Sequence, residues 1–155
     1  MTTRLDHTKA APGVYRAMGQ LEHYVRNCGL ESSLIELIKM RASQINGCAY
    51  CLDMHTKDAR AAGESEQRLY LLSAWREAPF YSERERAALE WTEALTLIAE
   101  NDVSDELYNR VKPHFTDEEL ANLSLAIITI NGWNRLAISF RAEVGSYQPK
   151  QTAAH

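Results

Sequence analysis

The longest apolar segment of the chain constrains its fold more than any other feature. It runs from Thr116 to about Val144 and opens with Thr116-Asp117-Glu118-Glu119, the pattern of a capping box at a helix N-terminus. The segment is too apolar for a helix with only one buried side, so we expect the central helix of a core or part of a subunit interface. Gly132 is a candidate position for a kink in this helix.

The rest of the sequence also favours helices. It contains no alternating run rich in Val, Ile and Thr, which argues against a β-rich fold. At 155 residues the chain has the size of one domain, and it can bury a core without disulfide staples. We therefore expect an all-α, single compact domain over residues 1–155, with about six to eight helices and a loose tail at 146–155. The expected helices cover residues 13–27, 33–46, 48–63, 65–77 and 82–101, a short stretch after Ser104, and 116–144.

Composition and charge exclude several classes of protein. Hydrophobic residues make up 45% and charged residues 25%, as in ordinary globular domains. The net charge of −4 gives no basic surface for nucleic acid. No apolar run is long enough for a membrane span, and residues 1–12 lack the apolar core of a signal peptide. We expect a cytoplasmic protein without nucleic-acid or membrane partners.

The most informative local motif is a cysteine pair followed by a histidine. The chain has three cysteines, an odd number that does not fit a framework of structural disulfides. Cys48 and Cys51 form a Cys-x-x-Cys, and on a helix that begins there Cys51 and His55 lie about 60° and about 20° from Cys48. A helix N-terminus favours a thiolate, and His55 can accept its proton. Cys28 is expected to be a buried bystander thiol.

Glu36 is a lone carboxylate in an apolar run, twelve residues before Cys48. The turn at Asn46-Gly47 can fold its helix back against the cysteine helix. Burial among apolar residues is expected to raise the pKa of Glu36, so that it relays protons together with His55. The alternative is that Glu36 completes a capping box with Ser33 and stays in water at the helix start.

Other chemistries of the cysteine pair remain as alternatives. Cys48, Cys51 and His55 offer three ligands to zinc, and Cys28 can in principle supply a fourth, but a second paired motif is missing from the sequence. Haem attachment needs a histidine directly after the second cysteine, where this chain has Leu52. Two buried structural thiols are the simplest alternative. We expect neither a metal nor a bound cofactor.

In combination, these residues resemble the AhpD-like alkylhydroperoxidases of the carboxymuconolactone decarboxylase superfamily. The decarboxylase branch of that superfamily lacks the cysteine pair, so the resemblance points to redox chemistry. The motif block covers residues 36–63, and the matching residues are Glu36, Arg41, Ser43, Cys48, Tyr50, Cys51, His55 and Gly63.

The resemblance implies an antioxidant oxidoreductase that reduces hydroperoxides. Carried over to this chain, Cys51 is the peroxidatic cysteine, Cys48 the resolving cysteine, and Glu36 and His55 a proton relay. An external dithiol, of a lipoyl or thioredoxin-like type, would reduce the resulting disulfide. The family also implies a homo-oligomer, either a trimer or a hexamer.

One position departs from some family members, which carry a histidine directly before the second cysteine. Here that residue is Tyr50, which can form a hydrogen bond but is not a base near neutral pH. Tyr50 and Asn131 are candidate pocket residues, although the polar cluster from Asn131 to Arg135 can equally support a subunit contact. A general disulfide reductase or a non-enzymatic redox-sensing stress protein would share the cysteine pair.

Overall fold

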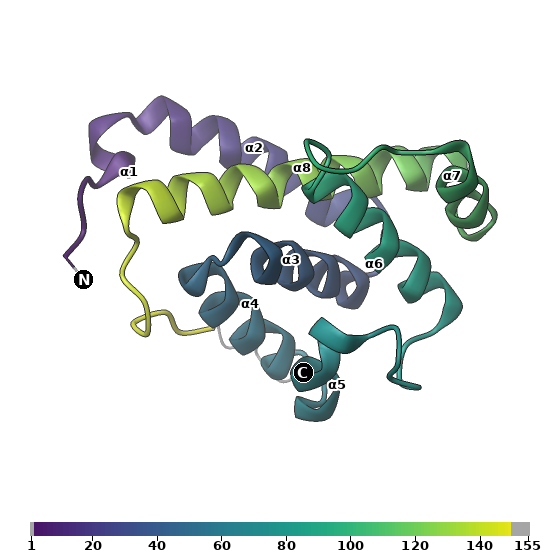
Figure 1. Ribbon diagram of the computed structural model, residues 1–155. Helices are drawn as coiled ribbons and strands as arrows, with labels where there is room; N and C mark the ends of the chain where they lie inside the picture. Colours follow the sequence, from purple (N-terminus) through teal and green to yellow (C-terminus); the bar gives the residue numbers. More distant parts are fainter. Residues whose placement is uncertain (1, 150–155) are drawn as a thin grey trace.

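The computed structural model describes residues 2–149, and within them the chain is helical and contains no strand (Figure 1). The expected all-α fold in a single compact domain is confirmed for these residues. None of their helices is long and apolar enough to cross a membrane. The α-helices are α1 His7–Ala10, α2 Pro12–Asn27, α3 Ser32–Asn46, α4 Ala49–Ala61, α5 Glu66–Leu71, α6 Glu83–Thr96, α7 Asp105–Val111 and α8 Asp117–Phe140, and 3₁₀-helices follow α5 and α7 at Leu72–Ala74 and Lys112–His114.

Several helix ends differ from the expected ones. The α5 helix passes into a 3₁₀-helix after Leu71 instead of continuing to residue 77, and α6 ends at Thr96. The α8 helix ends at Phe140 because Arg141 adopts a left-handed conformation with φ of 54°. The short α1 helix was not expected from the sequence. Asp6 caps it by accepting hydrogen bonds from two backbone N–H groups of its first turn.

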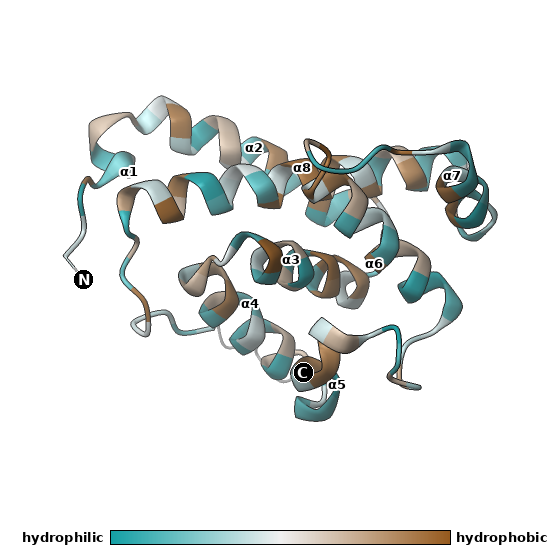
Figure 2. Ribbon diagram, viewed as in Figure 1, coloured by the Kyte–Doolittle hydropathy of each residue, from teal (hydrophilic) through white to brown (hydrophobic). Residues whose placement is uncertain are grey.

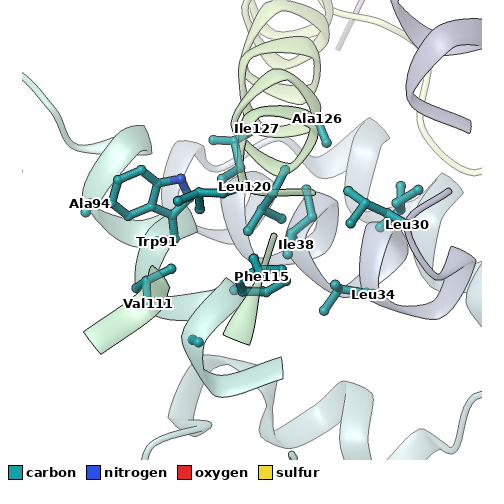
Figure 3. Close-up of a cluster of buried hydrophobic side chains, with 14 of the residues drawn as sticks. Leu30, Leu34, Ile38, Trp91, Ala94, Val111, Phe115, Leu120, Ala126 and Ile127 are labelled. Carbon is teal, nitrogen blue, oxygen red and sulfur yellow. The ribbon is translucent and has the colours of Figure 1, made fainter. Parts of the chain in front are cut away.

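The core lies around α3, which packs against α4, α6 and α8. Leu34 and Ile38 of α3, Trp91 of α6, and Leu120 and Ile127 of α8 converge in the largest hydrophobic cluster (Figure 3). The apolar α8 segment is thus a core helix, as its composition predicts. Hydrophobic and hydrophilic residues nevertheless both occur along α3 and α8 (Figure 2), and the buried residues of each helix include polar ones.

Gly132 does not interrupt α8, which continues as one helix to Phe140. A Cβ atom at position 132 would lie 2.9 Å from the Cε atom of Met18 on α2. The missing side chain therefore leaves room for the end of the Met18 side chain where α2 packs against α8.

The segment after α8 turns back toward α4 (Figure 1). Lys57 of α4 donates a hydrogen bond to the backbone oxygen of Tyr147 (3.0 Å), and the Tyr147 hydroxyl donates to Asp58 Oδ1 (2.8 Å). Burial and the neighbouring Asp58 raise the pKa of Tyr147 to about 12. The expected loose tail is therefore tied to α4 as far as Tyr147, and its residues 150–155 lie outside the described part of the chain.

Candidate functional site

The turn between α3 and α4 places both cysteines at a helix N-terminus. Gly47 ends α3 in a left-handed conformation with φ of 68°, which a glycine adopts without strain. The chain then reverses, and the Cys48 N–H bonds back to the carbonyl of Ser43 at 2.9 Å. Cys48 is consequently the N-cap of α4, and Cys51 lies in its first turn.

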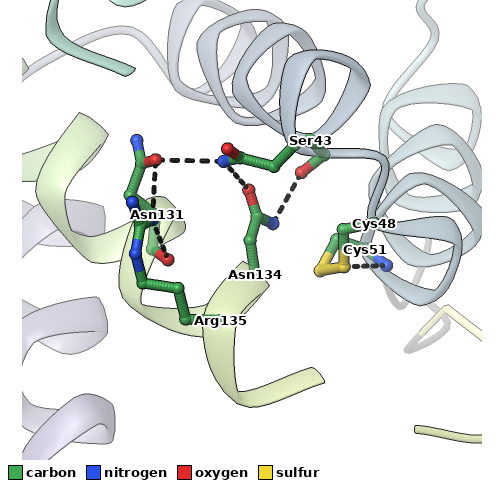
Figure 4. Close-up of a disulfide and its surroundings, with 7 residues drawn as sticks. Ser43, Cys48, Cys51, Asn131, Asn134 and Arg135 are labelled. Atoms are coloured by element: carbon green, nitrogen blue, oxygen red, sulfur yellow. Dashed lines mark hydrogen bonds between the residues drawn. A yellow bond between two sulfur atoms is a disulfide. The ribbon is translucent and has the colours of Figure 1, made fainter. Parts of the chain in front are cut away.

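A disulfide joins Cys48 and Cys51, whose Cα atoms are 5.3 Å apart (Figure 4). The Cys51 N–H donates to Cys48 Sγ at 3.3 Å. The two cysteines are only 1% and 2% exposed, and Tyr50, Ala137 and Ala142 pack against them. The chain itself therefore covers the sulfur atoms.

The buried face of α4 consists of Cys51, His55 and Ala59, each one turn after the last. His55 is 2% exposed, and its Nδ1 lies 2.8 Å from Oε2 of Glu36 on α3. No described residue forms a hydrogen bond with His55 Nε2. The structure thus brings the histidine and the carboxylate together on the face of α4 that carries Cys51.

Glu36 is 6% exposed, and it does not cap its helix. The α3 helix starts at Ser32 with no side-chain hydrogen bond at its N-cap, so the alternative of a capping box between Ser33 and Glu36 is wrong.

The expected raised pKa of Glu36 is also wrong. Burial does raise the pKa of this carboxyl, but His55 and the Arg26 guanidinium, whose Nη1 lies 2.7 Å from Glu36 Oε1, outweigh burial and hold the pKa at about 2. Apolar neighbours along one helix suggested a raised value, whereas cationic or hydrogen-bonding groups from two other helices decide it. Glu36 is therefore a carboxylate at neutral pH.

Arg26 belongs to a larger buried ionic network that the sequence did not reveal. Its Nε lies 2.7 Å from Glu22 Oε1, and the same oxygen pairs with Lys39 Nζ. Lys39 is fully buried, and burial lowers its pKa more than the Glu22 carboxylate restores it. Two features of the sequence could have indicated this network. Lys39 is a lone lysine inside an apolar run, and Glu22 and Arg26 are four residues apart on α2.

A second polar network is built mainly from amide and hydroxyl side chains and ties the end of α3 to α8 (Figure 4). Asn46 Nδ2 donates to Asn131 Oδ1 (3.0 Å) and to Asn134 Oδ1 (2.8 Å), and Asn134 Nδ2 donates to Ser43 Oγ (3.0 Å). Arg135 donates to Asn131 Oδ1 at 3.0 Å. The polar cluster of α8 therefore makes contacts within the chain, and Asn131 belongs to this amide network.

A cleft of about 410 Å³ lies on the Glu36 side of the site. Glu36 and Arg26 line it together with Asp58, Gly63 and Glu64, while the cysteines do not. Gly63 has a φ of 95°, which explains a glycine at this motif position after α4. Glu36 therefore borders the cleft with the small exposed part of its side chain, whereas the disulfide is covered.

Cys28 lies apart from the cysteine pair and packs against the largest hydrophobic cluster. Its Sγ lies 3.0 Å from the carbonyl oxygen of Val25. Among residues 2–149, no group of three or more His, Cys, Asp and Glu side chains is arranged to hold a metal ion.

Comparisons with known proteins identify the family of the chain. Residues 12–94 match the carboxymuconolactone decarboxylase family. The uncharacterized protein YdfG of Bacillus subtilis strain 168 is 48% identical over 139 residues, which are 90% of this chain and 95% of YdfG.

Two solved structures illustrate the likeness in fold. ATU0492 of Agrobacterium tumefaciens, a protein of unknown function proposed to be the antioxidant defence protein AhpD, has a TM-score of 0.91 and 47% identity, over 94% of this chain and 100% of that one. The debrominase Bmp8 has a TM-score of 0.79 and 20% identity, over 90% of this chain and 75% of that one, and shows the shared fold alone. The chain thus belongs to the carboxymuconolactone decarboxylase family, as an AhpD-like member.

Proposed function

We propose that this protein is a thiol-dependent peroxidase that reduces hydroperoxides with Cys48 and Cys51. The observation that carries the proposal is the hydrogen bond between His55 and Glu36, buried one turn along α4 from Cys51. A redox-active pair needs this combination of a helix N-terminus and a positioned base. The likeness to ATU0492, itself proposed to act in antioxidant defence, supports the same activity.

The proposed reaction has three steps. The Cys51 thiolate attacks one peroxide oxygen, and an S–O bond forms as the O–O bond breaks. The leaving alcohol or water takes up the proton that His55 removed from Cys51. The Cys48 thiol then attacks the Cys51 sulfenic acid, and water leaves as the disulfide forms. An external dithiol returns two electrons and two protons by thiol–disulfide exchange.

Within this scheme, His55 is the base and Glu36 its positioning partner. The ionised Glu36 can only accept a hydrogen bond, so Nδ1 of His55 carries the hydrogen and Nε2 keeps its lone pair. That lone pair can take the Cys51 proton. Glu36 thus acts on the reaction through His55 instead of carrying the proton itself.

Access and assembly complete the proposal. Because the cysteines are 1% and 2% exposed, a hydroperoxide reaches Cys51 only when Tyr50 or the segment that starts near Ala142 moves.

A lipoyl or thioredoxin-like dithiol in the cytoplasm is the proposed reductant, and no cofactor or metal takes part. The family resemblance also leads us to propose a homotrimer or homohexamer.

Mass spectrometry of the thiols after one equivalent of an alkyl hydroperoxide tests the peroxidase. We expect Cys48→Ser to accumulate a sulfenic acid at Cys51 and Cys51→Ser to form no intramolecular disulfide. Cys28→Ser is the matched control and should form the disulfide as the unmodified protein does. If Cys48→Ser yields no sulfenic acid at Cys51, the assigned roles are wrong.

One contact favours a second candidate function, general disulfide reduction. The Cys51 N–H points at Cys48 Sγ, and a donor at a helix N-cap stabilises a Cys48 thiolate, the nucleophile that disulfide exchange requires. Turnover of an alkyl hydroperoxide and of a small disulfide, measured with the same dithiol, separates the two. Faster turnover of the small disulfide would favour the reductase.

A further inference from the structure

We infer that Arg26 of α2 is a positioning residue, which fixes the orientation of the Glu36 carboxylate so that His55 can act as the base. This inference rests on the proposed function, because it adds a residue to the same site. Arg26 lies outside the motif block of residues 36–63 and on a different helix.

The two oxygens of Glu36 have separate partners. Oε1 lies 2.7 Å from Arg26 Nη1, and Oε2 lies 2.8 Å from His55 Nδ1. The carboxylate therefore cannot rotate without losing one of these bonds. Because the Glu36 side chain is only 8% exposed, water does not easily replace a lost partner.

Arg26 is itself held in place by a second carboxylate, that of Glu22. Its Nε lies 2.7 Å from Glu22 Oε1, and Lys39, whose side chain is fully buried, pairs with the same oxygen. A surface ion pair normally contributes little because both side chains move freely in water. Here the 40% exposed Arg26 side chain is tied to a carboxylate that a buried lysine holds, so its guanidinium is presented to Glu36 in one geometry.

The cation at position 26 keeps the Glu36 carboxylate aimed at His55. With Arg26 present, the guanidinium holds Oε1, and Oε2 accepts a hydrogen bond from Nδ1. Without the cation, the carboxylate can turn away from Nδ1. His55 then loses the hydrogen bond that leaves its Nε2 lone pair free for the Cys51 proton. The charged and titratable groups around Glu36 are Arg26 and Glu22 from α2, Lys39 from α3, His55 and Asp58 from α4, and Glu64 from the following loop.

The test is the pH dependence of Cys51 reactivity in the reduced protein. Iodoacetamide alkylation of Cys51 is followed by mass spectrometry between pH 5 and 9 in the unmodified protein, Arg26→Met and Arg26→Lys. Arg16→Met is the matched control, because Arg16 is exposed on the same helix and pairs with no described acidic residue.

We expect the acid limb of the Arg26→Met profile to move up by about one pH unit, which is about tenfold slower alkylation at pH 6 with near-normal rates at pH 8. Arg26→Lys keeps the cation and should recover most of the shift. A uniform slowing at every pH, or a profile equal to that of Arg16→Met, would overturn the inference.

Peroxide oxidation of Cys51, measured on the same samples, tests the proposed function separately. An unshifted alkylation profile with sulfenic acid still formed overturns the role of Arg26 alone. A shifted profile without sulfenic acid in any variant supports the role of Arg26 in thiol activation and overturns the peroxidase.

Discussion

Two partly buried polar networks lie along α3, about two turns apart, and only one of them is built from ion pairs. The ionic network surrounds Glu36 and draws on α2 and α4. The amide network surrounds Ser43 and draws on α8. The ionic network leaves one buried atom, Glu22 Oε2, without a hydrogen-bond partner among the described residues. The two networks also differ in what they allow the protein to do.

The amide network has no group that changes charge near neutral pH, and it holds the end of α3, just before the cysteine turn, against α8. The ionic network stores charge in a site with little water, where desolvation works against each ion and loss of one partner leaves another uncompensated. When one group of this network gains or loses a proton, the energies of its charged partners therefore change as well. The amide network therefore fixes the position of the cysteine turn against α8, and the ionic network holds the groups that a change of proton can affect.

The strongest test of this contrast is acid unfolding of the unmodified protein and Glu36→Gln. The folded-state pKa of Glu36, about 2, lies below its ordinary value of 4.5, so its stabilisation is complete above 4.5 and is lost as the pH falls through 2. At about 1.4 kcal/mol per pKa unit, the difference in free energy of unfolding between the two proteins should shrink by about 3 kcal/mol from pH 6 to pH 2. Urea titrations measure it. A difference that stays constant with pH would remove the distinction between the networks.

Asn134→Ala should give the next largest effect. The substitution removes the donor to the buried Ser43 hydroxyl and an acceptor for Asn46. We expect the free energy of unfolding to fall by about 2 kcal/mol. Because both partners are neutral, the loss should be the same at pH 6 and pH 3. The same urea titrations provide the measurement, and a strongly pH-dependent loss would show that the amide network is coupled to the charges.

Tyr147→Phe should have the smallest effect. It removes one hydrogen bond, to Asp58, from a partly exposed side chain outside both networks, so we expect a loss of about 0.5 kcal/mol. Tyr70→Phe is the matched control, because Tyr70 is 71% exposed and its hydroxyl also bonds to a carboxylate, Glu66. Thermal unfolding compares the two variants. If Tyr147→Phe lowers stability as much as Asn134→Ala does, the contacts of the C-terminal segment with α4 are as important for stability as the amide network.

The sequence by itself determined the features that depend on local backbone geometry. The capping box at Thr116 marked the start of α8, and Gly47 marked the turn before the cysteines. The spacing of Cys51 and His55 placed both on one face of α4, because successive turns of a helix repeat after about 3.6 residues.

Only the tertiary structure decided the electrostatics of the site. Asn134 bonds to Ser43 across 91 residues of sequence, Tyr147 reaches Asp58 across 89, and Arg26 meets Glu36 from another helix. The apolar neighbours of Glu36 along α3 predicted a raised pKa, and the groups packed beside it lower that pKa to about 2. A periodic pattern reports which face of a helix is buried, but a pKa depends on every charge and hydrogen bond that other helices bring within a few ångströms.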